Sequence, residues 1–142
     1  MPFERLWYET GNEHNPTDPY GRVRLDLSAD GTLRLDRFAR DGRGAWTART
    51  PEDYCGRVSR ALVVAGFPAA PTLVPPAGST MRALRVTGQT TATVLVPWSA
   101  SLPGYDDLFG LLDALVGAVT GLPRYPAVPG VHALEVVAAP PG

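Results

Sequence analysis

The sequence predicts a single α+β domain over residues 1–142, in which an antiparallel sheet, made of a meander and a second hairpin, packs two helices on one side. Three observations support this class. Strand-like segments with alternating apolar and polar residues occur in two groups, and one amphipathic helix follows each group. The length of 142 residues is usual for one domain. Hydrophobic residues make up 44% of the chain, which is enough to build a core.

The first group of strands forms the predicted meander. A strand rich in aromatic residues is expected over 3–9. Residues 22–28 and 32–36 alternate apolar and charged side chains, which is typical of half-buried strands. A turn is expected at 41–44, because it contains two glycines and an aspartate, and a further strand over 45–49.

The register of the hairpin between 22–28 and 32–36 follows from its leucines. A three-residue loop, Ala29-Asp30-Gly31, places leucine opposite leucine, whereas a two-residue loop would mix the two faces. Gly31 is then expected to adopt the left-handed conformation of a bulged turn. This register also sets opposite charges across the strands, namely Asp26 opposite Arg34 and Arg24 opposite Asp36.

Two helices are expected. Thr50 is predicted to cap the first helix and Pro51 to occupy its first position, because both residue types favour those places. This helix is expected to end at Ala65, with Gly66 closing it. A second helix is predicted over 105–120, since acidic residues occupy its first turn and apolar residues recur at helical spacing.

The remaining segments complete a repeated order of strands followed by a helix. A proline-rich link over 68–79 joins the halves. A second hairpin is expected from 81–87 and 91–98, and a last strand over 131–138. The resulting ββ-α/ββ-α layout is explained either by duplication or by the ordinary chemistry of helix ends.

Composition excludes several classes of function. The formal net charge is −1, whereas proteins that bind nucleic acid usually carry a basic excess, so no nucleic-acid partner is expected. All 13 basic residues are arginine, which rules out lysine chemistry. The single cysteine, Cys55, and the two histidines, His14 and His132, lack the spacing of metal ligands. The sequence therefore predicts no enzyme, no catalytic residue, no metal and no cofactor.

The expected location is the cytoplasm, with no membrane partner. The first residues lack the basic and apolar regions of a signal peptide. No stretch of about 18 uncharged apolar residues is present, so no transmembrane helix is expected.

Two surfaces are candidates for contact with a partner. The charged side of the first hairpin is either a solvated sheet face or a docking face. Trp, Tyr and Arg dominate the energetics of protein interfaces, so three aromatic residues are either contact residues that line one rim of the domain or members of the core. The predicted partner-binding residues are Arg22, Arg24, Arg34, Asp36, Tyr20, Trp46 and Trp98.

The helix over 105–120 supplies the second candidate surface. Its apolar residues cover more than half of its circumference, and most of the remainder is small. Such a helix is buried on more than one side. It is covered either by other parts of this chain or, in a homodimer, by a second copy that contacts Gly110, Ala114 and Gly117.

The order of the strands and helices expected over residues 21–120 resembles that of known protein families. Its most specific segments are Ala-Gly-Phe-Pro at 65–68 and Leu-Pro-Gly-Tyr-Asp-Asp-Leu-Phe at 102–109. This layout resembles that of small bacterial inhibitor proteins related to emfourin, and that of single-domain immunity proteins of polymorphic toxin systems. The resemblance assigns no individual inhibitory residue.

The resemblance implies a non-enzymatic protein-binding module that occludes a target, such as a toxin or an enzyme encoded nearby. Two other functions remain open from the residues alone. One is a structural protein that assembles through the helix over 105–120, and the other is a small-ligand-binding domain.

Overall fold

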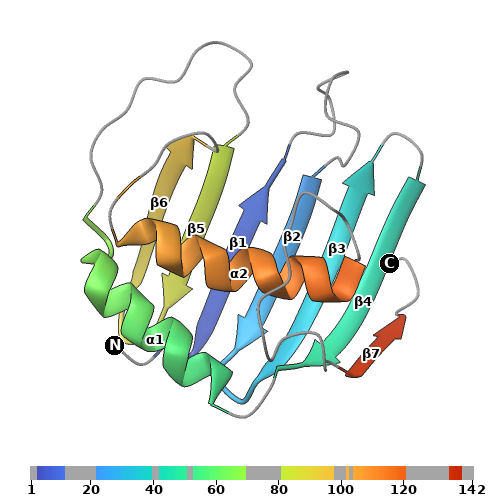
Figure 1. Ribbon diagram of the computed structural model, residues 1–142, viewed down its shortest axis with the longest axis horizontal. Coiled ribbons are helices and arrows are strands. Elements are labelled where there is room, and N and C mark those ends of the chain that lie inside the picture. Colours follow the sequence, from blue (N-terminus) through green and yellow to red (C-terminus); the bar gives the residue numbers. More distant parts are fainter. Residues whose placement is uncertain are drawn as a thin grey trace.

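The computed structural model describes residues 3–11, 22–39, 42–50, 53–69, 81–97, 102, 104–120 and 135–138. These residues form one seven-stranded sheet with the strand order β6-β5-β1-β2-β3-β4-β7 (Figure 1). Every neighbouring pair of strands is antiparallel. The strands are β1 (Arg5–Thr10), β2 (Arg22–Ser28), β3 (Thr32–Ala39), β4 (Gly42–Arg49), β5 (Met81–Thr87), β6 (Thr91–Pro97) and β7 (Glu135–Ala138).

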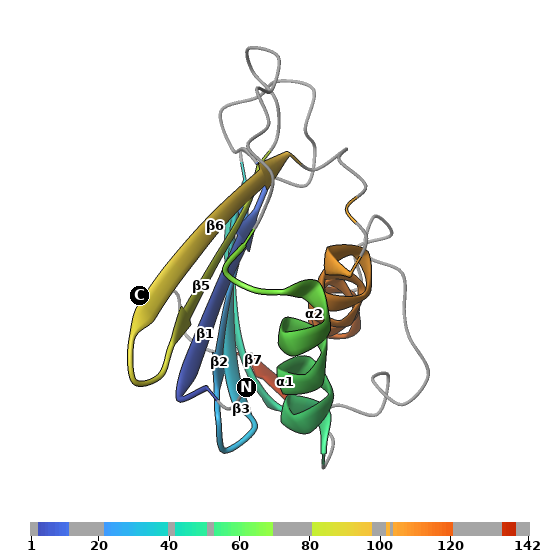
Figure 2. The same ribbon diagram turned by 90° about the vertical axis from the view of Figure 1, so that its left-hand side faces the viewer.

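Two helices cover one face of this sheet. Helices α1 (Tyr54–Ala65) and α2 (Tyr105–Thr120) lie side by side on that face, and no described helix lies on the other (Figure 2). The predicted α+β class, with both helices on one side of an antiparallel sheet, is therefore confirmed. The predicted bounds of α2 are also those of the structure.

The two strand groups join into a single sheet because β1 pairs with a strand of each group, β2 along one edge and β5 along the other. Strands β1 to β4 follow one another as a meander on one side of β1. After α1 the chain returns to the other side of β1, where β5 pairs with it and β6 extends the sheet outward. After α2 the chain reaches the opposite edge, where β7 pairs with β4. Each helix thus follows a strand group and links distant parts of one sheet.

The register of the first hairpin is as predicted. Leu25 lies opposite Leu35 and Leu27 lies opposite Leu33. Gly31 has φ +92°, and its backbone N–H donates to the carbonyl oxygen of Ser28 over 3.0 Å. The three-residue loop therefore places all four leucines on the face under the helices.

Gly31 is expected to be a sensitive position. A Cβ at Gly31 would lie 3.0 Å from the Thr50 hydroxyl oxygen, and φ is positive there. Because a side chain is strained in this conformation, Gly31→Ala is expected to lower the free energy of unfolding by about 1–2 kcal/mol in urea titrations. The matched control is Gly110→Ala, where no atom lies within 4 Å of the added Cβ. This control is expected to stabilise helix α2 by about 0.5–1 kcal/mol, and equal stability of the two variants contradicts the prediction.

The start of α1 differs from the prediction. The helix begins at Tyr54, its N-cap is Asp53 with φ +71°, and no side chain caps it. Thr50 is not the cap, because the helix starts four residues after it, and its backbone N–H donates to the carbonyl oxygen of Gly31 over 2.8 Å. That hydrogen bond holds Thr50, which follows the last residue of β4, against the turn between β2 and β3. The predicted closing residue, Gly66, is confirmed at the other end of the helix.

The turn expected over residues 41–44 also differs. Gly42 pairs with Ala39, and Gly44 pairs with Arg37, so β4 starts before the expected strand. The ring of Trp46 occupies the space where a Cβ of Gly44 would lie. Glycine is therefore required in this strand because a neighbouring indole covers it.

The core lies between the sheet and the helices. Its members share near-complete burial and come from strands β1 to β6 and from both helices. The largest fully buried apolar side chains are those of Tyr8, Tyr54, Leu6, Leu25, Leu27, Leu33, Leu35, Leu62, Leu84, Leu108, Leu112 and Leu115.

Candidate functional site

The helix-free face of the sheet brings together four of the predicted contact residues. Successive side chains of a strand point to opposite faces. Since the leucines of β2 and β3 face the core, Arg22 and Arg24 on β2 project from the helix-free face, as do Arg34 and Asp36 on β3. The predicted charged face is thus one continuous side of a larger sheet.

The predicted aromatic residues do not join this face. Trp46 lies on the opposite side of β4 and packs, partly buried, against the core. Tyr20 and Trp98 lie outside the described residues.

Two other aromatic residues, which the sequence analysis did not select, occupy the helix-free face. The ring of Trp7 lies between the guanidinium groups of Arg24, at 5.8 Å from the ring centroid, and Arg85, at 5.2 Å. The guanidinium of Arg22 lies 4.7 Å from the centroid of the Phe38 ring. At these distances the positive charges are attracted to the ring faces. Trp7 alternates along β1 with Leu6 and Tyr8, which are buried. This alternation was the sequence pattern from which the position of Trp7 on the helix-free face could have been predicted.

A hollow of about 340 Å³ lies beside the Trp7 ring and the guanidinium groups of Arg24 and Arg85. It crosses strands β1, β2 and β5, so distant parts of the chain build it. Its lining residues are Arg5, Trp7, Arg24, Asp26, Arg85 and Thr87.

The carboxylates of this face are paired with arginines, although not in the expected combinations. Arg24 contacts Glu9 of β1 over 3.1 Å rather than Asp36. Arg34 forms its ion pair with Asp36 of its own strand over 3.2 Å, and the cross-strand Asp26 acts on Arg34 only as a more distant charge. Arg24 lies between Glu9 and Asp36 on the neighbouring strands, and Asp36 is already engaged by Arg34. The expected register is correct, but tertiary neighbours redirect the ion pairs.

Charge on the helix-free face differs in sign from that of the whole chain. On strands β5, β1, β2 and β3, five arginines and three carboxylates occupy this side, which leaves a positive excess. The formal net charge of the chain is −1. The five arginines are Arg5, Arg22, Arg24, Arg34 and Arg85, and the three carboxylates are Glu9, Asp26 and Asp36.

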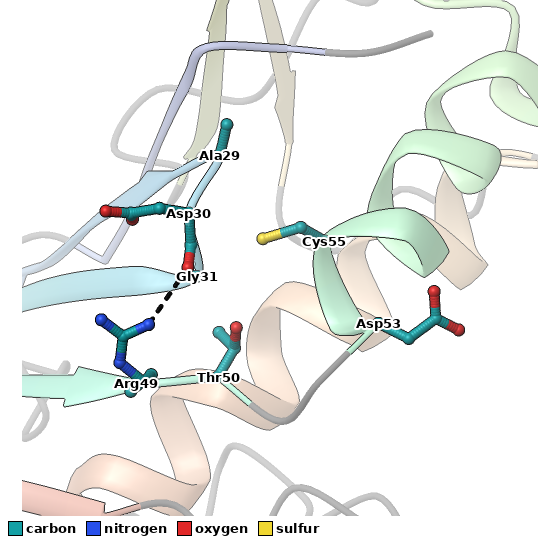
Figure 3. A pocket seen from close by; sticks show the side chains of 7 residues that line it. All are labelled: Ala29, Asp30, Gly31, Arg49, Thr50, Asp53 and Cys55. Atoms are coloured by element: carbon teal, nitrogen blue, oxygen red, sulfur yellow. Dashed lines mark hydrogen bonds between the residues drawn. The ribbon is translucent and has the colours of Figure 1, made fainter.

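A second hollow, of about 310 Å³, lies where the hairpin turn meets the start of α1 (Figure 3). The Cys55 side chain points toward the turn and lies 3.6 Å from the carbonyl oxygen of Ser28. Burial raises the pKa of the Cys55 thiol. A raised pKa disfavours the thiolate, which is the reactive form of cysteine.

The predicted small-residue stripe of α2 is not a single surface. Gly110 is exposed, and Gly117 is partly buried. Ala114 is fully buried in the core of the same chain. Ala114, one of the expected oligomer contacts, therefore lies inside the fold, because this side of α2 packs against other elements of the same chain.

A buried polar cluster joins α2 to the sheet, and no sequence pattern indicated it. The Tyr8 hydroxyl donates to Asp113 over 2.7 Å, and the Arg82 guanidinium donates to the other Asp113 oxygen over 2.9 Å. Arg82 also donates to the Tyr8 hydroxyl and lies 4.9 Å from the centroid of the Phe109 ring. This cluster fixes the position of α2 over β1 and β5.

No protein-family model matches the chain, and no curated protein sequence matches it significantly. Within the described part of the chain, no group of three or more metal-ligating side chains gathers in one place. The described helices include none with the length and apolar character needed to span a membrane.

Proposed function

We propose that this chain is a non-enzymatic protein-binding module, of the inhibitor or immunity type, which occludes its target with the helix-free face of the sheet. The observation that carries the proposal is the pairing of Trp7 and Phe38 with arginines on the face of the sheet that no described helix covers. Tryptophan and arginine are the residue types that most often dominate binding energy at protein interfaces. Ion pairs and ring contacts hold these side chains in place, which lowers the entropic cost of binding.

The charge of the face indicates the chemistry of the target. Arg85 contacts the Trp7 ring and the Thr93 hydroxyl, and Arg5 makes only a long 4.0 Å contact with Asp26. Both arginines line the hollow beside Trp7. A target with an acidic surface is complementary to this arrangement. The proposed setting is the cytoplasm, with the target encoded nearby, as for a toxin or an enzyme that must be held inactive.

The test is capture of the target with the purified chain, followed by an assay of the target's own activity. The expected result is a complex in which that activity is lost. Trp7→Ala is expected to weaken the complex about 30-fold, which corresponds to a hot-spot loss of about 2 kcal/mol. Arg85→Glu is expected to slow association and to remove much of its dependence on salt.

The matched control is Arg60→Ala, since Arg60 is also an exposed arginine but lies on α1, in the helix layer. It is expected to leave affinity unchanged. If the target binds Trp7→Ala and Arg85→Glu as tightly as it binds the natural chain, the helix-free face is not the binding surface.

A further inference from the structure

Arg85 carries a positive charge that no described carboxylate balances. It is exposed on β5, and the strand register places Trp7 of β1 on one side of it and Thr93 of β6 on the other. Its guanidinium lies 5.2 Å from the centroid of the Trp7 ring and donates to the Thr93 hydroxyl over 3.4 Å. Both neighbours are uncharged. Within the described part of the chain Arg85 forms no ion pair, so its charge is available to a partner.

The carboxylates at and beside the hollow are already paired with other arginines. Glu9 contacts Arg24 over 3.1 Å. Asp26 lies 4.0 Å from Arg5. Around the hollow, three arginines therefore meet two carboxylates, and the difference is one positive charge. That charge belongs to Arg85, because the other two arginines are the ones that have carboxylate partners.

A carboxylate is the anion that matches this arrangement. It carries one negative charge, whereas a phosphate group carries about −1.5 to −2 at neutral pH and would exceed the local excess. The Nε–H of Arg85 is used by Thr93, which leaves the N–H groups of both Nη atoms for a ligand. The two oxygens of a planar carboxylate accept parallel hydrogen bonds from such a fork. The Thr87 side chain lines the same hollow and adds a hydroxyl donor.

The hollow is also ordered and sized for one acidic side chain. Contact with the Trp7 ring and the Thr93 hydroxyl holds Arg85 in place, which lowers the entropy lost on binding. The volume of about 340 Å³ lies near the lower end of the range for ligand pockets, about 300–1,000 Å³. No described helix lies over this face of the sheet (Figure 2), so the side chain of a protein partner can reach the hollow.

We propose that the hollow across β1, β2 and β5 binds the carboxylate of one aspartate or glutamate side chain of the target. Arg85 is the principal contact, and the Trp7 ring is the wall that holds Arg85 in place. This inference rests on the proposed function, because it names the chemical group of the target that the helix-free face recognises.

Titration with a glutamate-rich peptide blocked at both ends tests this proposal. The reporter is the NMR signal of the Trp7 indole N–H, assigned by its loss in Trp7→Phe. A saturable shift is expected, and the same peptide with glutamine in place of glutamate is expected to give none. Arg85→Gln is expected to raise the dissociation constant about tenfold, through the loss of a charge-assisted hydrogen bond. The matched control Arg60→Gln removes the same charge from α1 and is expected to leave the dissociation constant unchanged.

Three results overturn the proposal: no saturable shift, equal binding of the glutamine peptide, or unchanged binding by Arg85→Gln, whose fold the same spectra verify. Inorganic phosphate that binds more tightly than the glutamate peptide also overturns it, because the site then prefers a dianion. The proposed function is judged separately. It stands if a captured target loses affinity for Trp7→Ala although the glutamate peptide does not bind, and it falls if the peptide binds at Arg85 but no captured target is inhibited.

Discussion

Asp113→Ala is expected to lower the free energy of unfolding by about 3–5 kcal/mol. The side chains of Asp113 and Arg82 are only 11% and 12% exposed, and they contact each other over 2.9 Å. Removing the carboxylate leaves the Arg82 charge in the interior without that partner, and the Tyr8 hydroxyl loses the oxygen to which it donates. The total free energy of unfolding of a domain is about 5–15 kcal/mol, so the expected loss is a large fraction of it. Chemical denaturation of the variant measures it.

Two further variants identify the cause of that loss. Asp107→Ala removes an exposed carboxylate from the first turn of the same helix and is expected to cost less than about 1 kcal/mol. Asp113→Leu combined with Arg82→Met removes both charges and is expected to recover much of the lost stability, because a buried pair can often be replaced by apolar residues. An Asp113→Ala variant as stable as Asp107→Ala contradicts this account of the cluster.

Leu112→Ala is the second change with a large expected effect. Leu112 is fully buried, where α2 packs over the sheet. Truncation is expected to lower the free energy of unfolding by about 3–5 kcal/mol, through lost burial and the cavity that remains. Leu111→Ala, one residue away and only partly buried, is the matched control with a smaller expected loss. Denaturant midpoints measured on both variants check the difference, and similar losses contradict the assignment of Leu112 to the centre of the core.

Local patterns in the sequence predicted much of the fold. The leucines of the first hairpin fixed the loop length and register, because any one-residue shift would move them out of the core. The acidic first turn and apolar spacing of α2 predicted both of its ends. The start of α1 was predicted wrongly, because the helix begins at Tyr54 with Asp53 as its N-cap, whereas Thr50 lies beside the turn that contains Gly31.

The candidate site was predictable only in part. The charged residues of β2 and β3 were identified because they alternate with leucine. Trp7 and Arg85 were missed because they belong to strands from opposite halves of the chain, and they meet only where β1 and β5 pair. Trp46 suits an interface by its residue type, but its position on β4 points it at the core, which is the alternative that the sequence left open.

The sequence by itself determined which segments are strands and helices, which side of each strand is apolar, and how the first hairpin aligns. These properties depend on neighbours within a few residues, and the hydrophobic period records them directly. Only the tertiary structure decided that both hairpins share β1, that Asp113 meets Arg82 and Tyr8, and that Trp7 meets Arg85. These features depend on contacts between residues far apart in the chain, which no local period specifies.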